Sequence, residues 1–310
     1  MPIKLGLSLP QMKQFNLAQD LVPVARAAEE TGYDSLWVFE RTLYPTPMTQ
    51  GLYDVPGLEW PDAYRSVADP LVTLAMAAAV TERVRLGSSV LVAPYHVPFQ
   101  LARWFATLDV ASNGRALAGF GTGWSRDEYA AGSVAPIEKR GAVLDEMLDV
   151  FAAVHGPDPV SYQGELSTIA PAEVGPKPAR PVPVYLAASG GPALRRLVDR
   201  ADGWLPVGMS AEQLAGAWQG VRDLADERGR TRPLDVSVRA NVVHTPKPFE
   251  GEGRQPFQGS VEQIVEDVVA HAAIDGIGEI LLDLCHTARD AQELIDVSRE
   301  VHAAVRAAGV

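Results

Sequence analysis

Cysteine is almost absent from this sequence of 310 residues. The single cysteine, Cys285, leaves no internal disulfide to form and excludes a cysteine-rich metal site. The six histidines show no ligand spacing, and neither H-E-x-x-H nor a Cys/His array occurs. We therefore expect no metal site, and hydrolysis by a bound metal has little support.

Basic stripes and long apolar runs are missing as well. The 27 Lys and Arg residues face 39 Asp and Glu residues, which gives a net charge of −12. Binding of nucleic acid needs basic stripes, so this balance argues against it. The apolar runs at 3–9 and 71–80 are too short to span a membrane, and the first is also too short for a signal peptide. We expect a cytoplasmic protein with neither nucleic acid nor membrane as a partner.

Motifs of several common enzyme classes are also absent. No G-x-S-x-G elbow and no P-loop lysine occur, which removes support for an activated-serine hydrolase. After Leu9 the chain continues PQMKQF, without the glycines of a dinucleotide-binding turn. A bound cofactor that carries the chemistry is the remaining economical hypothesis.

What the sequence does contain is an alternation of short apolar runs and segments with helical periodicity. Each run is followed by a helical segment, which predicts an α/β fold, a (β/α)8 TIM barrel, in one domain over 1–310. A doubly wound open sheet is the alternative, and the missing glycine motif after the first run argues against it. The runs are residues 3–9, 34–40, 84–94, 114–121, 182–188, 203–208, 234–243 and 278–284.

Three long segments follow strands and should therefore lie at the carboxyl-end face, where barrel active sites are built. Residues 41–67 carry four prolines and several aromatic side chains, which favours an ordered insertion that acts as a lid. Residues 121–135 follow the fourth strand, and residues 244–259 are expected to form a loop over the active site. A small hairpin is expected within 160–169.

Two glycine-rich turns are candidate anion sites. In GFGTGW the fourth strand ends at Thr122, Gly123 and Trp124, where glycine lets backbone approach a ligand closely. In AASGG the fifth strand ends just before a helix, whose free amides attract anions. The alternatives are a bare turn and an ordinary helix cap. The candidate residues of the second turn are Ser189, Gly190 and Gly191.

The ends of the second and third strands supply further candidates. Glu40 is a candidate general acid or base and Arg41 a candidate anion clamp, with a structural Glu–Arg ion pair as the alternative. His96 is a second proton-transfer candidate or a bystander. In GSSVLVAP the small residues would let a flat ring lie against the backbone, or Gly87 serves only barrel packing.

With these residues in place, the chain resembles the bacterial luciferase-like oxidoreductases, in particular the actinobacterial branch that uses the deazaflavin coenzyme F420. The resemblance starts at LGLSLP and is most specific at TERVRLGSSV and LDVASNGR. It extends from end to end of the chain. The other matching segments lie within 68–124, 138–151, 175–204 and 259–284.

The resemblance implies a (β/α)8 barrel with F420, or alternatively flavin mononucleotide (FMN), lying across the carboxyl-end face. It implies a non-prolyl cis peptide at Ser89–Val90, within a segment from Ser88 that presses on the buried face of the ring. It also implies a homodimer that acts on a small-molecule substrate. The phosphate contacts it implies are Thr122, Gly123, Trp124, Ser189, Gly190 and Gly191.

One departure from the family pattern bears on the reaction. The family commonly ends the second strand with Asp-His, whereas this chain has Glu40–Arg41. Because arginine stays protonated, it does not readily pass protons. We therefore expect hydride donation to an unsaturated or imine group of the substrate rather than alcohol oxidation. The alternatives are an FMN-dependent monooxygenase that uses oxygen, a non-catalytic binder of the coenzyme, and a cofactor-free barrel hydrolase.

Overall fold

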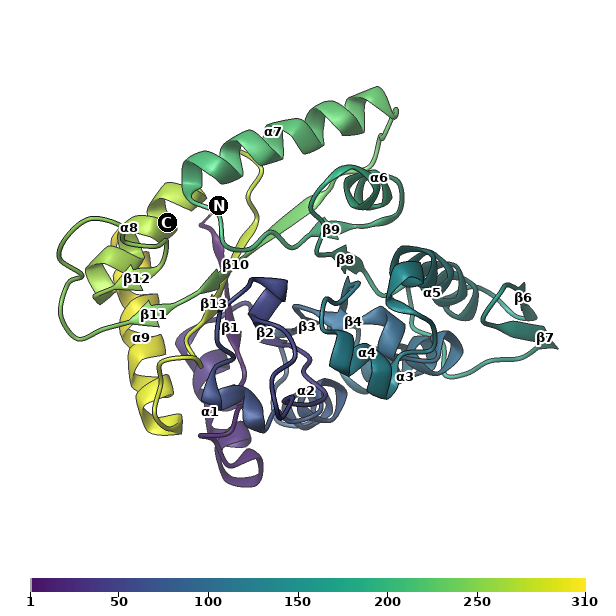
Figure 1. The fold of residues 1–310 in the computed structure, drawn as a ribbon, viewed down its shortest axis with the longest axis horizontal. Coiled ribbons are helices and arrows are strands. Elements are labelled where there is room, and N and C mark those ends of the chain that lie inside the picture. Colours follow the sequence, from purple (N-terminus) through teal and green to yellow (C-terminus); the bar gives the residue numbers. More distant parts are fainter. Residues whose placement is uncertain (1) are drawn as a thin grey trace.

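The computed structural model describes residues 2–310 and shows a closed parallel barrel (Figure 1). The main sheet has the strand order β3-β2-β1-β13-β10-β9-β8-β5-β4, and an additional pairing of β3 with β5 closes it. Since β3 and β4 are two parts of one interrupted strand position, the barrel has the eight positions that the sequence predicts. The strands are β1 (Lys4–Ser8), β2 (Ser35–Val38), β3 (Arg85–Ser88), β4 (Leu91–Val92), β5 (Ala116–Gly121), β8 (Val184–Leu186), β9 (Gly203–Trp204), β10 (Asp235–Asn241) and β13 (Glu279–Asp283).

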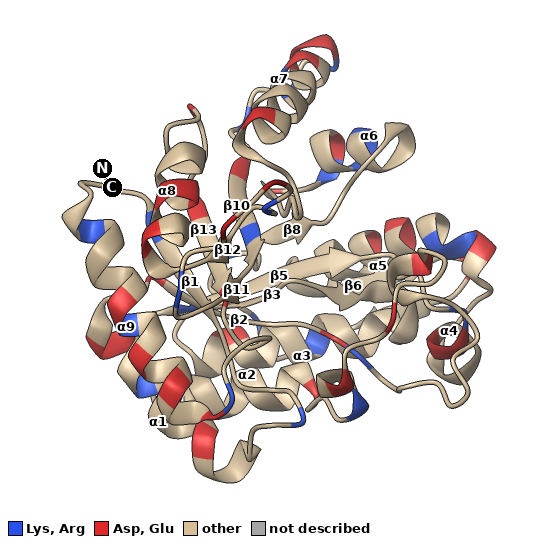
Figure 2. Cartoon of the chain, turned by 60° about the vertical axis from the view of Figure 1, so that its left-hand side comes forward, with Lys and Arg blue, Asp and Glu red and all other residues tan. Residues whose placement is uncertain are grey.

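Helices cover the outside of the barrel, and many of their residues are charged (Figure 2). They follow the predicted alternation apart from the additional α4, and a 3₁₀ turn at Ile137–Lys139 precedes α5. The helices are α1 (Leu17–Thr31), α2 (Pro70–Ala78), α3 (Pro98–Ala111), α4 (Arg126–Gly132), α5 (Arg140–His155), α6 (Gly191–Arg200), α7 (Ala211–Glu227), α8 (Val261–Ala272) and α9 (Ala291–Ala307). Among the residues described, no helix combines the length and apolar character needed to cross a membrane.

Local sequence fixes where these helices start and stop. The side chain of Asn16 accepts a hydrogen bond from the amide of Ala18, 3.1 Å away, and so caps α1. The helix ends at Gly32, whose φ of 106° suits glycine better than any residue with a Cβ. Ser210 and Gln213 form a capping box at the start of α7. Each cap satisfies amides or carbonyls that the helix itself leaves free.

Large side chains fill the lower part of the barrel interior. The rings of Trp37 and Tyr185 are buried there against Leu117 and Leu281. Glycines make the room: a Cβ on Gly87 would lie 2.5 Å from the Trp37 ring. Gly87 is therefore a packing glycine, which was the alternative weighed for this strand.

A polar network closes the barrel floor around the buried Glu279. Its carboxylate accepts hydrogen bonds from Ser35, from Ser237 at 2.7 Å and from Arg85 at 3.0 Å. A buried charge is costly unless paired and hydrogen-bonded, and here every neighbour is a donor. The floor thus combines packed rings with a buried carboxylate that is fully hydrogen-bonded.

Four segments lie outside the regular alternation. The insertion after β2 is ordered and contains 3₁₀ turns at Leu52–Asp54 and Asp62–Arg65. The segment 121–135 contains α4, a helix that the sequence pattern did not predict. The expected hairpin forms from β6 (Val160–Gln163) and β7 (Thr168–Ala172) and projects at the right-hand edge of Figure 1. The loop after β10 is flanked by the paired short strands β11 (Val243–His244) and β12 (Gln258–Gly259).

Candidate active site

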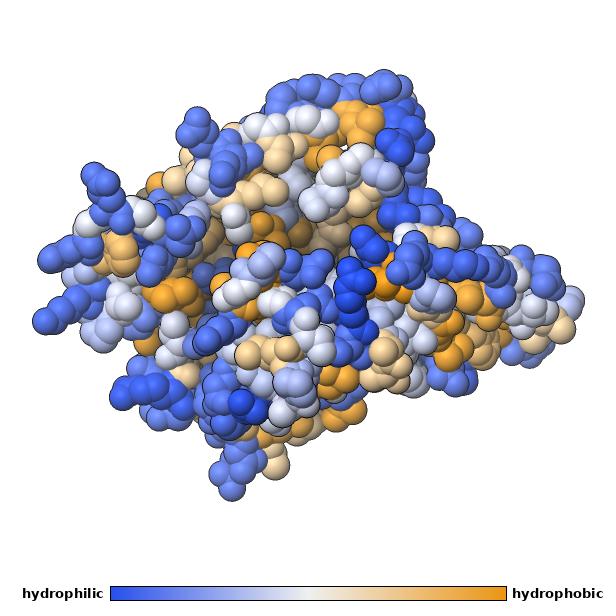
Figure 3. Space-filling view, viewed as in Figure 1, coloured by the Kyte–Doolittle hydropathy of each residue, from blue (hydrophilic) through white to orange (hydrophobic). Residues whose placement is uncertain are grey.

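A cavity of about 470 Å³ opens at the carboxyl ends of the strands. The space-filling view shows apolar side chains in a hollow near the middle of the molecule (Figure 3). The cavity walls come from the ends of five barrel strands, from the loop after β9 and from the insertion that follows β2. The lining residues are Phe39, Glu40, Arg41, Tyr53, Tyr64, Ser89, Val90, Val92, Gly121, Thr122, Gly123, Trp124, Ala187, Leu205, Val207, Gly208, Arg239 and Asn241.

One wall, which we call the platform, is the interruption between β3 and β4. The Ser89–Val90 peptide is cis, which confirms the expectation for this bond. The amide of Ser89 donates to the carbonyl of Val38 at 2.7 Å, and the hydroxyl of Ser88 donates to the carbonyl of Gly119 at 2.9 Å. Val90 packs on the aromatic floor cluster below it. The backbone of this segment is therefore held from both neighbouring strands and from beneath.

The glycines of the fourth predicted strand leave the space beside the platform free. A Cβ on Gly121 would come within 2.7 Å of the Val90 side chain. A Cβ on Gly123 would lie 2.6 Å from Val92, and its φ of 70° also favours glycine. Thr122 and Trp124 line the same wall. GFGTGW is thus part of the cavity wall, and its contact with a coenzyme stays a prediction.

Glu40 is buried and engaged at the end of β2. Its carboxylate accepts from the amide of Val92 at 2.6 Å and lies 2.9 Å from His96 Nε2. Only 4% of the Glu40 side chain is exposed, and His96 does not line the cavity. The structure thus brings Glu40 and His96 together, and the pair ties β2 to the segment after β4.

Arg41 is also paired inside the protein, but not with Glu40. Its Nη1 lies 2.8 Å from the carboxylate of Glu128 on α4, which is completely buried. The guanidinium also lies 4.8 Å from the ring centre of Trp124 and 5.6 Å from that of Trp60. The local ion pair considered for Glu40 and Arg41 is therefore replaced by two separate pairs with distant partners. Glu128 sits in the first turn of a short helix that the sequence pattern did not predict, so no sequence signal indicated it.

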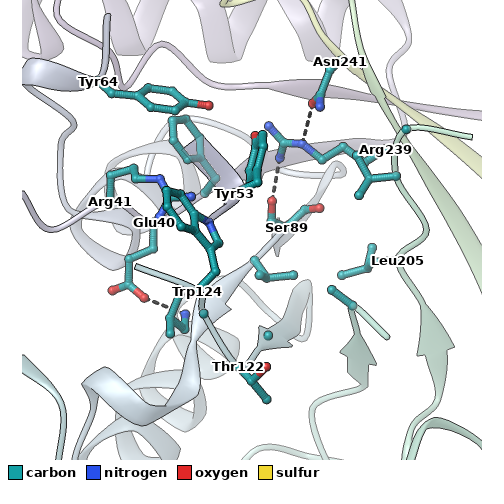
Figure 4. Close-up of a pocket in the computed structure, with 18 residues that line it drawn as sticks. Glu40, Arg41, Tyr53, Tyr64, Ser89, Thr122, Trp124, Leu205, Arg239 and Asn241 are labelled. Atoms are coloured by element: carbon teal, nitrogen blue, oxygen red, sulfur yellow. Dashed lines mark hydrogen bonds between the residues drawn. The ribbon is translucent and has the colours of Figure 1, made fainter. Parts of the chain in front are cut away.

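A second arginine, Arg239 on β10, faces the cavity and was missed in the sequence. It donates to the carbonyl of Ser89 at 2.6 Å and to Asn241 at 2.9 Å, as Figure 4 shows. Its other nitrogen pairs with Asp283, whose side chain is fully buried. The motif VRAN within a strand gave a weak signal, since a charge inside a barrel strand needs a partner. Arg239 braces the platform from across the barrel.

Aromatic side chains from the insertion (Tyr53 and Tyr64) and from the ends of β2 and β5 (Phe39 and Trp124) form a further stretch of the cavity wall. Tyr53 and Trp124 are 5.6 Å apart between ring centres, and Phe39 and Tyr64 are 5.5 Å apart. The side chain of Gln50 holds the insertion in place, because it donates to the carbonyl of Trp124 at 3.2 Å. The expected ordered insertion therefore does contribute to the cavity wall. We call this stretch the aromatic wall.

The hydroxyl of Tyr64 connects the aromatic wall to the far end of β13. It lies 3.4 Å from His286 Nε2, and that nitrogen lies 3.5 Å from Asp283. Burial raises the pKa of Tyr64, and the neighbouring Tyr53 adds to this shift while Arg239 opposes it. Tyr64 is therefore a protonated hydroxyl at neutral pH.

The remaining candidates lie away from the cavity lining. Ser189, Gly190 and Gly191 are exposed at the start of α6, where Gly190 is the N-cap and no side chain caps the helix. Pro192 occupies the first turn of this helix. Within the described part of the chain, no residue of 244–259 lines the cavity. The structure thus joins candidates from strands two, three and four, whereas the turn after strand five lies outside the cavity lining.

The fold and the cavity define a (β/α)8 barrel with a ligand site at the carboxyl ends of its strands. The model of the luciferase-like monooxygenase family matches residues 6–251. The chain belongs to this family.

Curated relatives and solved structures agree with this assignment. An F420-dependent glucose-6-phosphate dehydrogenase of Kineococcus radiotolerans is 34% identical over 207 residues, which are 66% of this chain and 56% of the relative. An uncharacterised protein of Mycobacterium tuberculosis is 36% identical over 188 residues, and the match covers 58% of this chain and 65% of the relative. The chain thus spans about two thirds or less of the length of these relatives.

Solved structures show the same fold at low sequence identity. Monooxygenase RslO1 from Streptomyces bottropensis superposes with a TM-score of 0.79 at 18% identity and covers 99% of this chain and 100% of its own. An F420-dependent secondary alcohol dehydrogenase, solved with an F420–acetone adduct, gives a TM-score of 0.75 at 18% identity, with 99% and 100% coverage. At such identities the likeness concerns the fold.

Proposed function

We propose that this protein is an F420-dependent oxidoreductase that transfers a hydride from the reduced deazaflavin to an unsaturated or imine group of a small organic substrate. The observation that carries the proposal is the cavity lined by the platform and the aromatic wall, in a barrel of the luciferase-like family. The relatives named as F420-dependent dehydrogenases support the choice of coenzyme.

The platform has the shape and chemistry that a flat ring system requires. Val90, Ala187, Leu205 and Val207 offer apolar surface, and the absence of a Cβ at Gly121 keeps the space beside Val90 open. A ring that stacks there is held in a dry, fixed orientation, which is what hydride transfer needs from the protein. The bound deazaflavin would supply the hydride chemistry.

The outer end of the coenzyme, with its phosphate, fits the turn before α6. Ser189, Gly190 and Gly191 expose backbone amides at a helix N-terminus, and Arg195 lies in the first turns of the same helix. Amides and the helix dipole both favour an anion at this place. We propose that this turn and the Thr122–Gly123 backbone hold the phosphate between them.

We propose that Tyr64 supplies the proton that completes the reduction. Arg41 does not serve this role, since it stays protonated and is paired with Glu128. Glu40 and His96 bind each other and the amide of Val92, so they position the platform instead. Tyr64 lines the cavity, and His286 lies 3.4 Å from its hydroxyl, within reach to return a proton to it.

The test is a titration of the purified protein with F420 and with FMN, followed by quenching of coenzyme fluorescence. Tight binding of F420 alone supports the proposal and directs the substrate search toward enones and imines. Tight binding of FMN alone favours the second candidate, an FMN-dependent monooxygenase on the same platform. Binding of neither coenzyme overturns the proposed function.

We propose further that two copies pair through α2 and α3. A groove of about 510 Å³ runs between these helices, and Val72 and Trp104 stand 54% and 48% exposed beside it. Exposed apolar surface of this kind marks an interaction site, and a two-fold pairing would let each copy cover the other's groove. Sedimentation should show a dimer, and Trp104→Glu should convert it to a monomer. A monomeric wild type would contradict this pairing.

A further inference from the structure

Building on the proposed function, we propose that the aromatic wall selects an uncharged, ring-bearing substrate and rejects an anionic one. The wall presents Phe39, Tyr53, Tyr64 and Trp124 to the cavity. Trp60 backs it, with its ring centre 5.0 Å from that of Trp124. Rings of this number and spacing favour a planar apolar partner.

The charges of the cavity lining decide against an anion. The lining contains only three charged side chains among the described residues, and each has an internal partner. Arg41 pairs with Glu128 and Arg239 with Asp283, and both of these carboxylates have fully buried side chains. Figure 4 shows both arginines in the cavity wall. The third, Glu40, is itself acidic and pairs with His96, so it adds no attraction for an anion.

Both arginine charges are neutralised by buried carboxylates, so among the described residues the lining offers a substrate no uncompensated positive charge, although Nε of Arg41 has no hydrogen-bond partner. A carboxylate or phosphate that enters a buried site must exchange its water for partners, and an unpaired buried charge is strongly unfavourable. Here the guanidinium of Arg41 already has a carboxylate and two indole rings around it. An uncharged ring has no such cost and gains from burial against the aromatic wall.

This conclusion separates the chain from the relatives named as glucose-6-phosphate dehydrogenases. A phosphate monoester carries about two negative charges at neutral pH and is usually held by arginine or lysine. No lysine lines this cavity, and both of its arginines are neutralised from within the described structure. We therefore expect that glucose 6-phosphate does not bind here.

The test compares two naphthalene probes of similar size on the full-length protein. The probes are 2-acetylnaphthalene, which is neutral, and 2-naphthoate, which is a carboxylate. Binding is followed by quenching of tryptophan fluorescence, since Trp124 and Trp60 lie in the wall. We expect the wild type to bind the ketone at least 10-fold more tightly than the carboxylate and to show no binding of glucose 6-phosphate.

The variant Glu128→Gln tests the cause. In the wild type the amide of Thr42 donates a hydrogen bond to Glu128 Oε1 at 2.7 Å, and the glutamine oxygen can still accept it. The substitution removes the negative charge that neutralises Arg41. We expect affinity for 2-naphthoate to rise about 10-fold while that for the ketone stays within threefold. Asp283→Asn, which frees Arg239, should act in the same direction. It serves as the second variant if Glu128→Gln does not fold.

The matched control is Asp127→Asn, one residue away. Asp127 accepts a hydrogen bond from Thr49 and does not touch Arg41. It removes the same net charge from the protein, and probe affinities should change less than twofold. Equal affinity of the wild type for both probes, tight binding of glucose 6-phosphate, or an unchanged preference in both charge-removing variants would overturn the inference.

The outcome is separable from that of the proposed function. Probe binding needs neither coenzyme nor turnover. If the protein binds a coenzyme but does not prefer the neutral ketone over 2-naphthoate, only the substrate inference is overturned. If the protein prefers the neutral ketone but binds neither F420 nor FMN, only the proposed function is overturned.

Discussion

The floor and the mouth of the barrel solve the same packing problem in opposite ways. At the floor, glycines point inward and large rings fill the space they leave, as Trp37 does against Gly87. At the mouth, Gly121 also points inward, but only the edge of Val90 approaches it and a cavity remains. Inward-facing glycines thus allow large rings to pack at the floor of the barrel and leave room for a cavity at its mouth.

Buried ion pairs show the same contrast. At the floor, Glu279 is enclosed by hydrogen-bond donors. At the mouth, the pairs of Arg41 and Arg239 stand in the wall of an open cavity. The comparison teaches that changes at the floor should act on folding, whereas changes at the mouth should act on binding and rate.

The largest effect is expected for Gly119→Ala, just below the cavity. A Cβ at this position would lie 1.7 Å from the carbonyl oxygen of Ser88, so the backbone of β3 would have to move. We expect a loss of at least about 3 kcal/mol in the free energy of unfolding, measured with denaturant. Gly216→Ala on α7, where nothing lies within 4 Å, is the control and should not destabilise. A stability within 1 kcal/mol of wild type, roughly, would contradict the packing described.

Glu279→Ala should follow, at about 3 kcal/mol of lost stability, because it leaves Arg85 without its partner in the floor. The control is Arg289→Ala, which breaks an exposed pair with Glu293 and should cost at most about 0.5 kcal/mol. Denaturant unfolding measures both. Equal losses in the two variants would show that the floor network is not a special contributor.

Tyr64→Phe should affect rate and leave folding intact. If Tyr64 donates the proton, its loss should slow a single turnover about 100-fold, the lower end of the range for general acids. Affinities for coenzyme and substrate should stay unchanged. Tyr44→Phe removes a hydroxyl that bonds only the carbonyl of Trp60, and it should leave the rate unchanged. An unaltered rate in Tyr64→Phe would assign the proton to another group.

The smallest effect is expected for Gly121→Ala. The new Cβ would meet the Cγ2 of Val90 at 2.7 Å, and that side chain can turn into the cavity. We therefore expect about a 10-fold loss of coenzyme affinity, or about 1.4 kcal/mol, with stability changed by less than about 1 kcal/mol. Titration of the variant with F420 and FMN, followed by coenzyme fluorescence, measures the affinity. Unchanged affinity would mean that the ring does not stack beside Val90.

Much of the fold was predictable from the sequence because it depends on local periodicity. Apolar runs and helical segments alternate, and caps such as Asn16 and Gly32 mark the helix ends. Deviations occur where tertiary contacts decide, as at α4, whose short sequence has little amphipathic pattern and whose Glu128 is drawn inward by Arg41.

The candidate site was predictable only in part. Glu40, Arg41, Thr122 and Trp124 were identified because they follow strands, and strand ends meet at one face of a barrel. Arg239 was missed because a strand residue shows which face it occupies only once its neighbours are known. Asp283, the last residue of β13, was missed for the same reason, and His286 was missed although it follows that strand.

By itself, the sequence determined the order of strands and helices, the family, and the glycine-rich strand end that keeps the mouth open. The tertiary structure alone decided which charges meet. Glu128 is 87 residues from Arg41, and Asp283 is 44 residues from Arg239. Such pairs form because burying one charge requires an opposite one nearby, and the barrel determines which residues are near. The charge of the substrate that this cavity accepts depends on those long-range pairs.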